Sequence, residues 1–110
     1  MDSTIDADVY RELQATAGAE FVAELVDTFF QEAPGMLAAL RAARSAGDAD
    51  VYRRAAHSLK SNSLTFGATA LAAAARAQEL GGIGSAADVD ALDAEYAHAA
   101  AALKELRDGA

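Results

Sequence analysis

The candidate chemistry of this 110-residue chain falls on imidazole, because it has two histidines and no cysteine. His57 lies in a stretch with helical periodicity. On a helical wheel of about 100° per residue, three cations and the small Ser61 fall on the side of His57. The cations are Arg53, Arg54 and Lys60. A basic surface of this kind suits a negatively charged group, for example a phosphoryl group carried on the ring.

The opposite side of this helix is predicted to face the core. It carries Val51, Tyr52, Ala55, Leu59, Asn62 and Phe66. His57 is then expected at the centre of the solvent-facing side, close to Leu64. The alternative is an ordinary surface histidine, with the two arginines in helix pairs with acids.

Two other chemistries find little support. His57 has no His, Cys, Asp or Glu three or four residues on, so no metal site is expected. Ser58 and Ser61 are not in a nucleophile elbow, which disfavours a Ser-His-acid hydrolase. His98 lies opposite the apolar stripe of its own helix, among alanines and acids, and is expected to be a surface residue.

Two helices are predicted to precede the helix that carries His57. Asp6 is the expected N-cap of a short helix that runs to about Thr16 and stops at Gly18, with Ile5 and Tyr10 as a hydrophobic staple. A long helix is predicted over 19–46. Its apolar positions, in steps of 4 and 3, are Val22, Val26, Phe29, Ala33, Met36, Leu40 and Ala43.

Pro34 falls inside this long helix. The apolar stripe keeps its phase on both sides of the proline, so we expect one helix that is kinked near Phe30–Gly35. Two helices that meet end to end are the alternative.

Three further helices are predicted. The first spans about 49–65 behind the N-cap Asp48, and the second spans about 68–80 after Gly67. A flexible linker at 81–84 and a sequence similar to a capping box, Ser85 with Asp88, precede the last helix at about 86–108. Its apolar stripe is Val89, Leu92, Tyr96, Ala99, Leu103 and Leu106.

Composition agrees with this helical reading. Alanine supplies 31 of the 110 residues and aromatic residues only 6%, which favours an all-α chain over a β-sandwich or barrel. Four helices that each carry one apolar stripe must bury these stripes against one another. We therefore predict a single domain over 1–110: an antiparallel up-down four-helix bundle with a short N-terminal helix packed on it.

Charge and hydropathy restrict the possible partners. The net charge of −8 and the pI of about 4.5 disfavour nucleic-acid binding. No apolar run approaches the roughly 18–20 residues that cross a bilayer, and the N-terminus lacks the pattern of a signal peptide. We expect a cytoplasmic protein without a membrane partner, and a monomer, since one bundle satisfies both long stripes.

The sequence Ala55–Ser63 and the residues that follow it resemble the histidine-containing phosphotransfer (HPt) domain family. Its pattern is roughly H-x-L-K-G-[SA]-[SA], then an L-G-A-like step and, a helix later, L-E. The matching residues are His57, Leu59, Lys60, Phe66-Gly67-Ala68, Leu71 and Gln78-Glu79-Leu80. The resemblance covers nearly the whole chain. Ser61 stands where the family has glycine, and its hydroxyl could bond a phosphoryl oxygen.

The resemblance implies a role for each residue. His57 would accept a phosphoryl group from a receiver-domain aspartate and pass it to another receiver, and Lys60 would help to neutralise its charge. Glu79 would orient the imidazole, although Gln78 could be the hydrogen-bonding group and Glu79 a solvent-facing acid. The receiver would dock around His57, on the face that carries Arg53, Arg54 and Ser61 and at the rim formed by Leu64.

The implied partners are response-regulator receiver domains, a hybrid sensor histidine kinase, or both. The chain would be a carrier and not an enzyme, with no cofactor of its own, because Mg²⁺ would belong to the receiver. A non-catalytic helical adaptor is one alternative. A phosphoacceptor domain charged by a separate ATP-binding kinase domain is another.

Overall fold

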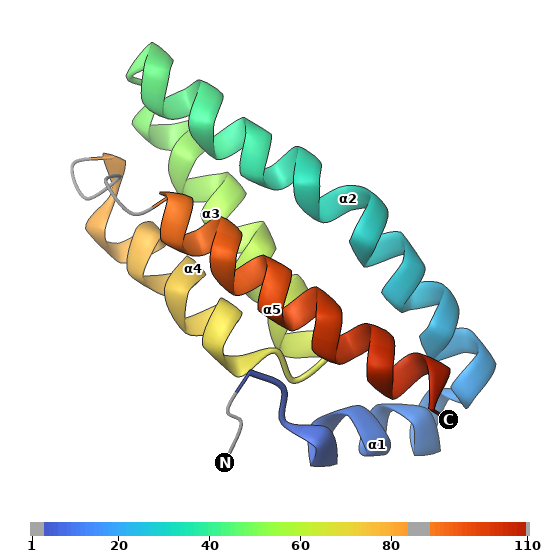
Figure 1. The fold of residues 1–110 in the computed structure, drawn as a ribbon. Coiled ribbons are helices and arrows are strands. Elements are labelled where there is room, and N and C mark those ends of the chain that lie inside the picture. The colour runs from blue at the N-terminus through green and yellow to red at the C-terminus, as the bar shows by residue number, and fades with distance from the viewer. Residues whose placement is uncertain (1–3, 84–88, 110) are drawn as a thin grey trace.

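The computed structural model describes residues 4–83 and 89–109, and the elements in these ranges are α-helices (Figure 1). They are α1 (Ala7–Ala17), α2 (Ala19–Ala46), α3 (Ala49–Thr65), α4 (Thr69–Gly81) and α5 (Val89–Asp108). The described residues contain no strand, so the all-α prediction is confirmed. No helix within these ranges is long and apolar enough to span a bilayer.

Helices α2 to α5 form the predicted bundle. α3 packs against α2 and α4, and α5 packs against the same two helices, so the four helices close a ring around the core. Successive helices run in opposite directions, and α1 packs on α2 at one end of the bundle (Figure 1). The buried apolar residues come from all five helices and form one cluster.

Helix α2 is continuous through Pro34, which excludes two separate helices. One position of its predicted stripe is wrong: Leu37 is buried where Met36 was expected. At about 100° per residue, positions 36 and 37 lie roughly 60° and 40° on either side of Ala33, so a step of three or of four from Ala33 keeps the stripe in phase and the packing decides between them. Met36 lies instead at the edge of the core, where its Sδ accepts a hydrogen bond from Asn62 Nδ2 (3.8 Å).

The predicted caps are present. Asp6 accepts a hydrogen bond from the amide of Asp8 (3.1 Å), and Asp48 accepts one from the amide of Val51 (3.1 Å). Gly47 ends α2 with a left-handed backbone (φ 71°). Helix α4 starts one residue later than predicted, at Thr69. The predicted capping box of Ser85 and Asp88 lies outside the described residues.

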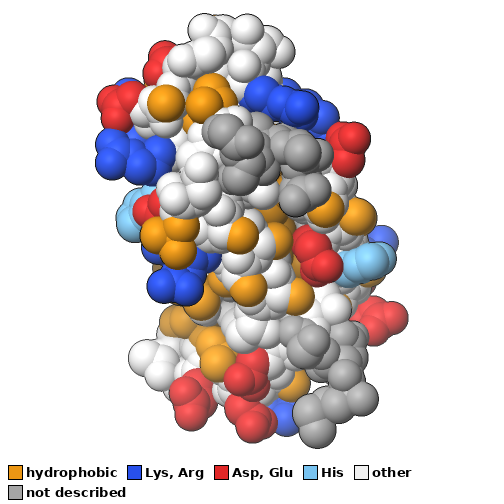
Figure 2. Space-filling view, turned by 90° about the vertical axis from the view of Figure 1, so that its left-hand side faces the viewer, with side chains coloured by type: hydrophobic (Ala, Val, Ile, Leu, Met, Phe, Trp, Pro, Cys, Tyr) orange, Lys and Arg blue, Asp and Glu red, His pale blue; other side chains and the backbone are white. Residues whose placement is uncertain are grey.

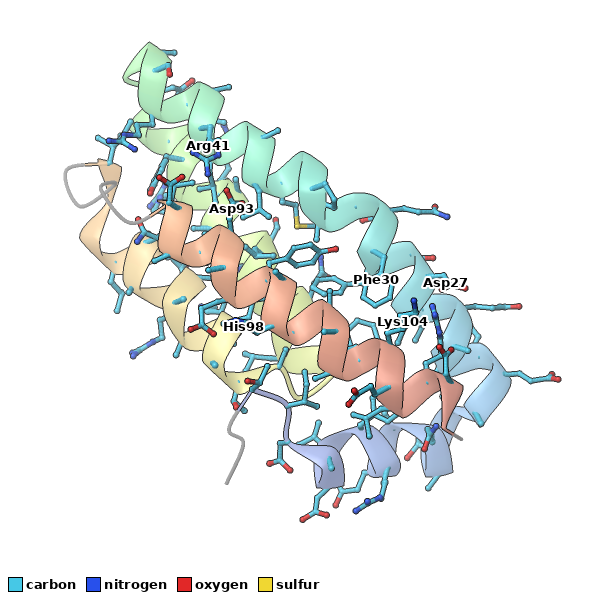
Figure 3. All side chains as sticks on the ribbon, viewed as in Figure 1. Asp27, Phe30, Arg41, Asp93, His98 and Lys104 are labelled. Atoms are coloured by element: carbon cyan, nitrogen blue, oxygen red, sulfur yellow. The ribbon has the colours of Figure 1, made fainter. Side chains whose placement is uncertain are left out.

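Ion pairs join α2 to α5 near both ends of α5. Arg41 on α2 pairs with Asp90 and Asp93 at the start of α5 (Figure 3). Near the other end, Arg107 pairs with Asp27 and lies over the ring of Phe30, 5.6 Å from its centroid. These contacts fix α5 against α2, on the side of the bundle away from His57.

The turn between α3 and α4 holds α1 in place. The carbonyl of Gly67 accepts a hydrogen bond from the amide of Asp6 (2.7 Å), and Gly67 has a positive φ of 73°. A Cβ at this position would lie 2.7 Å from the carbonyl oxygen of Asp6 and 3.0 Å from Cβ of Val9. Glycine is therefore required both by the backbone angle and by the close approach of α1.

Gly67→Ala is expected to destabilise the fold more than Gly47→Ala. Gly47 also has a positive φ (71°), in the left-handed helical region, but nothing lies within 4 Å of an added Cβ, so its substitution costs only the backbone strain, about 1–2 kcal/mol. Gly67→Ala adds overpacking of about 1–3 kcal/mol. Urea unfolding of both variants measures the difference, and equal losses would contradict the close contact between α1 and the α3–α4 turn.

Candidate functional site

His57 lies on α3 with its side chain 58% exposed, and its ring is held from the neighbouring helix. Nδ1 lies 2.7 Å from Oε2 of Glu79 on α4. Glu79 is 22 residues further along the chain, and only the antiparallel packing of α3 and α4 brings it beside the ring. The structure therefore joins the two residues that the sequence placed on separate helices.

The second oxygen of the same carboxylate accepts a hydrogen bond from Lys60. The distance from Nζ to Oε1 is 2.7 Å, and the side chains of Lys60 and Glu79 are only 22% and 18% exposed. The hydrogen bonds from Lys60 and then from His57 hold the pKa of the Glu79 carboxyl below its usual 4.5. Glu79 is therefore ionised at neutral pH and is not the solvent-facing acid of the alternative interpretation.

The ionisation of Glu79 determines which ring nitrogen of His57 carries the proton. An ionised carboxylate can only accept hydrogen bonds, so the proton of the neutral imidazole lies on Nδ1. Nε2 then keeps its lone pair and has no hydrogen-bond partner among the described residues. The arrangement is that of an oriented nitrogen nucleophile that points out of the bundle.

Gln78 does not join this site, contrary to the prediction that included it. Its side chain is buried, and its Oε1 accepts a hydrogen bond from the hydroxyl of Tyr52 at 2.5 Å. Adjacent residues on a helix point about 100° apart, so when Glu79 faces His57, Gln78 turns into the core. The partner of the imidazole is Glu79, and Gln78 instead links α4 to α3 inside the bundle.

The two arginines form helix ion pairs with an acid, as the alternative interpretation of the basic surface held. Nη2 of Arg53 lies 2.7 Å from Oδ1 of Asp50, and Nη2 of Arg54 lies 3.5 Å from Oδ2 of the same carboxylate. The sequence analysis did not name Asp50, although its spacing of three and four residues before the arginines is that of helix ion pairs. The basic surface around His57 is thus partly neutralised by two acids, Asp50 and Glu79.

The core-facing side of α3 is rotated from the prediction. Its buried residues are Tyr52, Ala56, Leu59 and Ser63, whereas Val51, Ala55 and Asn62 are only half-buried. Because α3 packs against α4 as well as α2, the face toward α4 is also covered. His57 therefore lies at the edge next to α4 and not at the centre of a solvent-facing side, and this edge position gives Glu79 access to the ring.

The outer surface around the ring also carries small and apolar side chains. Ser61 is exposed, as predicted, and Leu64 is 53% exposed. The sequence analysis did not predict that Leu80, next to Glu79, would be 70% exposed. Figure 2 shows this mixture along its left edge, where a His side chain lies between two Lys or Arg groups beside acidic and hydrophobic side chains.

The second histidine is not held by a hydrogen bond or an ion pair in the part of the chain that the structure describes. His98 is exposed on α5, as predicted, on a different face of the bundle (Figure 3). No group of three or more His, Asp or Glu side chains within the described ranges could hold a metal ion. The candidate site is therefore the group formed by His57, Lys60 and Glu79.

Comparisons with known proteins identify the family of the chain. The family model described as "Hpt domain" matches residues 24–109, which include His57, Lys60 and Glu79. A comparison with curated proteins finds no match. Among solved structures, the chain is similar to histidine-containing phosphotransfer protein B (HptB) from Pseudomonas aeruginosa PAO1. The sequences are 29% identical, the TM-score is 0.85, and the alignment covers 100% of this chain and 99% of the other. The chain belongs to the Hpt domain family of phosphorelay histidine phosphotransfer proteins.

Proposed function

We propose that His57 is the phosphoacceptor of this domain, which takes a phosphoryl group from a receiver-domain aspartate and passes it to another receiver. The observation that carries this proposal is the hydrogen bond from Nδ1 to the ionised Glu79, which leaves Nε2 exposed with its lone pair free. Among the described residues, the ring of His98 has no hydrogen bond or ion pair like the one that holds His57.

The proposed transfer is a nucleophilic displacement at phosphorus. The Nε2 lone pair of His57 forms the N–P bond while the bond from phosphorus to the aspartyl oxygen breaks, and the aspartate leaves as a carboxylate. The ring, which keeps its proton on Nδ1, becomes a phosphoimidazolium. Glu79 stabilises the positive charge on the ring through the hydrogen bond that it already accepts. Transfer to the next receiver reverses these steps.

Lys60 has a supporting role in this proposal. Its ammonium group donates one hydrogen bond to Glu79 and has two further N–H groups for phosphoryl oxygens. The carboxylate of Glu79 thus holds the nucleophile and a cation on the same side of α3. We propose that Lys60 offsets part of the charge that arrives with the phosphoryl group.

The remaining parts of the reaction are assigned to the partner. We propose that the chain is a carrier without kinase activity, that the receiver supplies the aspartate and its Mg²⁺, and that the chain acts as a cytoplasmic monomer. Exposed arginines whose surface ion pairs are weak suit a complex that forms and dissociates quickly.

His57→Gln is expected to abolish phosphorylation, since glutamine offers no nucleophilic nitrogen. The measurement is incubation with receiver domains charged by acetyl phosphate, followed by detection of an acid-labile, base-stable phosphoryl group. His98→Gln serves as the matched control and should label like the unchanged protein. Labelling retained in His57→Gln would refute the site. No transfer to the unchanged protein from any receiver would favour a non-catalytic adaptor.

Glu79→Ala is expected to slow transfer by about 10- to 100-fold while the bundle stays folded, because the imidazole loses the group that fixes its tautomer and orientation. Rapid-quench measurement of phosphohistidine formation gives the rate, and circular dichroism gives the fold. Glu79→Gln, which keeps a hydrogen-bond acceptor but no charge, should lie between the two. A rate unchanged in Glu79→Ala would remove the orienting role.

The lowered pKa of Glu79 also predicts a dependence of stability on pH. A carboxyl whose pKa is lower in the folded state stabilises the fold above its unfolded pKa, and this contribution is lost as the pH falls through the folded value. We therefore expect the free energy of unfolding of the unchanged protein to fall more than that of Glu79→Gln as the pH drops below 4.5. Urea titrations at several pH values measure this, and parallel curves would contradict it.

A further inference from the structure

A buried hydrogen bond joins α3 to α4 close to the site. The hydroxyl of Tyr52 on α3 donates to Oε1 of Gln78 on α4 (2.5 Å), and both side chains are buried. Ser63 is also buried, but its hydroxyl donates to the carbonyl of Leu59 in the same helix (2.6 Å). The bond between Tyr52 and Gln78 is therefore a directional contact between the two helices that form the site.

Gln78 is also the last buried residue of α4. The two buried residues nearest before it are Ala72 and Ala75, whose single methyl groups restrict the rotation of the helix only weakly. After it come Glu79, which is partly exposed, and Leu80, which is mostly exposed. Within the core, the last turn of α4, which carries Glu79, is thus fixed against α3 chiefly through Gln78.

The hydrogen bond between Glu79 and His57 tolerates little rotation of α4. A side-chain tip lies roughly 5–6 Å from the helix axis, so a rotation of about 10° moves it by about 1 Å. Such a shift away from the ring would lengthen the 2.7 Å contact between Oε2 and Nδ1 to about 3.7 Å, which is beyond hydrogen-bond distance. Apolar packing is not directional, whereas the bond between Tyr52 and Gln78 is, so this bond can hold the rotation closely enough.

We infer that Tyr52 and Gln78 are positioning residues for the phosphoacceptor. Their buried hydrogen bond sets the rotation of α4 and so keeps the carboxylate of Glu79 on the ring of His57. The inference rests on the proposed function, in which Glu79 orients the imidazole, and it adds two residues that govern the rate of transfer without touching the phosphoryl group. Buried polar contacts of this kind specify one packing of a core where apolar contacts alone admit several.

The first test compares Tyr52→Phe with Ser63→Ala. Each removes one buried hydroxyl from α3, but the hydroxyl of Ser63 bonds within its own helix and that of Tyr52 bonds to α4. The NMR shifts of the ring nitrogens of His57 report which nitrogen carries the proton, and they need no phosphate donor. We expect Tyr52→Phe to move these shifts toward those of Glu79→Ala and Ser63→Ala to leave them in place. Shifts that do not move in Tyr52→Phe would overturn the inference, whatever the site does.

The second test is a double-mutant cycle on the rate of transfer. With a receiver domain charged by acetyl phosphate, Tyr52→Phe alone should slow phosphohistidine formation by about 3- to 10-fold. In the Glu79→Ala background the same substitution should change the rate by less than about twofold, because the group that it positions is gone. Equal slowing in both backgrounds overturns the inference, since Tyr52 would then act through the stability of the bundle and not through Glu79.

The transfer rates also distinguish a failed inference from a failed function. If the unchanged protein is phosphorylated and Tyr52→Phe reacts at the same rate, or Ser63→Ala is slowed as much as Tyr52→Phe, the inference is overturned and the proposed function stands. If the unchanged protein accepts phosphate from no charged receiver, both are overturned.

Discussion

The carboxylate of Glu79 is the contact on which the site depends. It accepts hydrogen bonds from Nδ1 of His57 and from Nζ of Lys60, both at 2.7 Å, and so joins α3 to α4 at the candidate site. The hydrogen bonds from Lys60 and His57 lower its pKa, its negative charge holds the proton on Nδ1, and that proton leaves Nε2 free. Removing this one group would release both the orientation of the ring and the position of the ammonium.

The rest of the bundle serves to hold α3 and α4 in the register that this contact needs. Inside the bundle, Tyr52 and Gln78 form a buried hydrogen bond between the same two helices. At the end of the pair, Gly67 makes the turn and holds α1. On the far side, the ion pairs of Arg41 and Arg107 fix α5 to α2. Each contact is modest by itself, but together they leave one arrangement of α3 against α4.

Charge is distributed unevenly over this acidic chain of net charge −8. Three cations surround His57, yet Asp50 pairs with two of them and Glu79 with the third. Exposed ion pairs of this kind are weak, so the arginines can exchange Asp50 for an acidic partner. The partly buried pair of Lys60 and Glu79 is better shielded from solvent. The surface around His57 thus combines a fixed, partly buried ion pair with arginines whose exposed ion pairs can exchange.

The sequence by itself determined the helices, because caps and hydrophobic periodicity act between near neighbours. Asp6, Gly18 and Asp48 set helix ends correctly, and α2 was predicted over its full length despite Pro34. The sequence also singled out His57 and Lys60, which share one helix face. Only the tertiary structure decided between Gln78 and Glu79, and only it placed Leu37 inside and Met36 at the edge. Those outcomes depend on how each helix is rotated against its neighbours. Periodicity along a single helix does not fix that rotation well enough to choose between adjacent residues, which point about 100° apart.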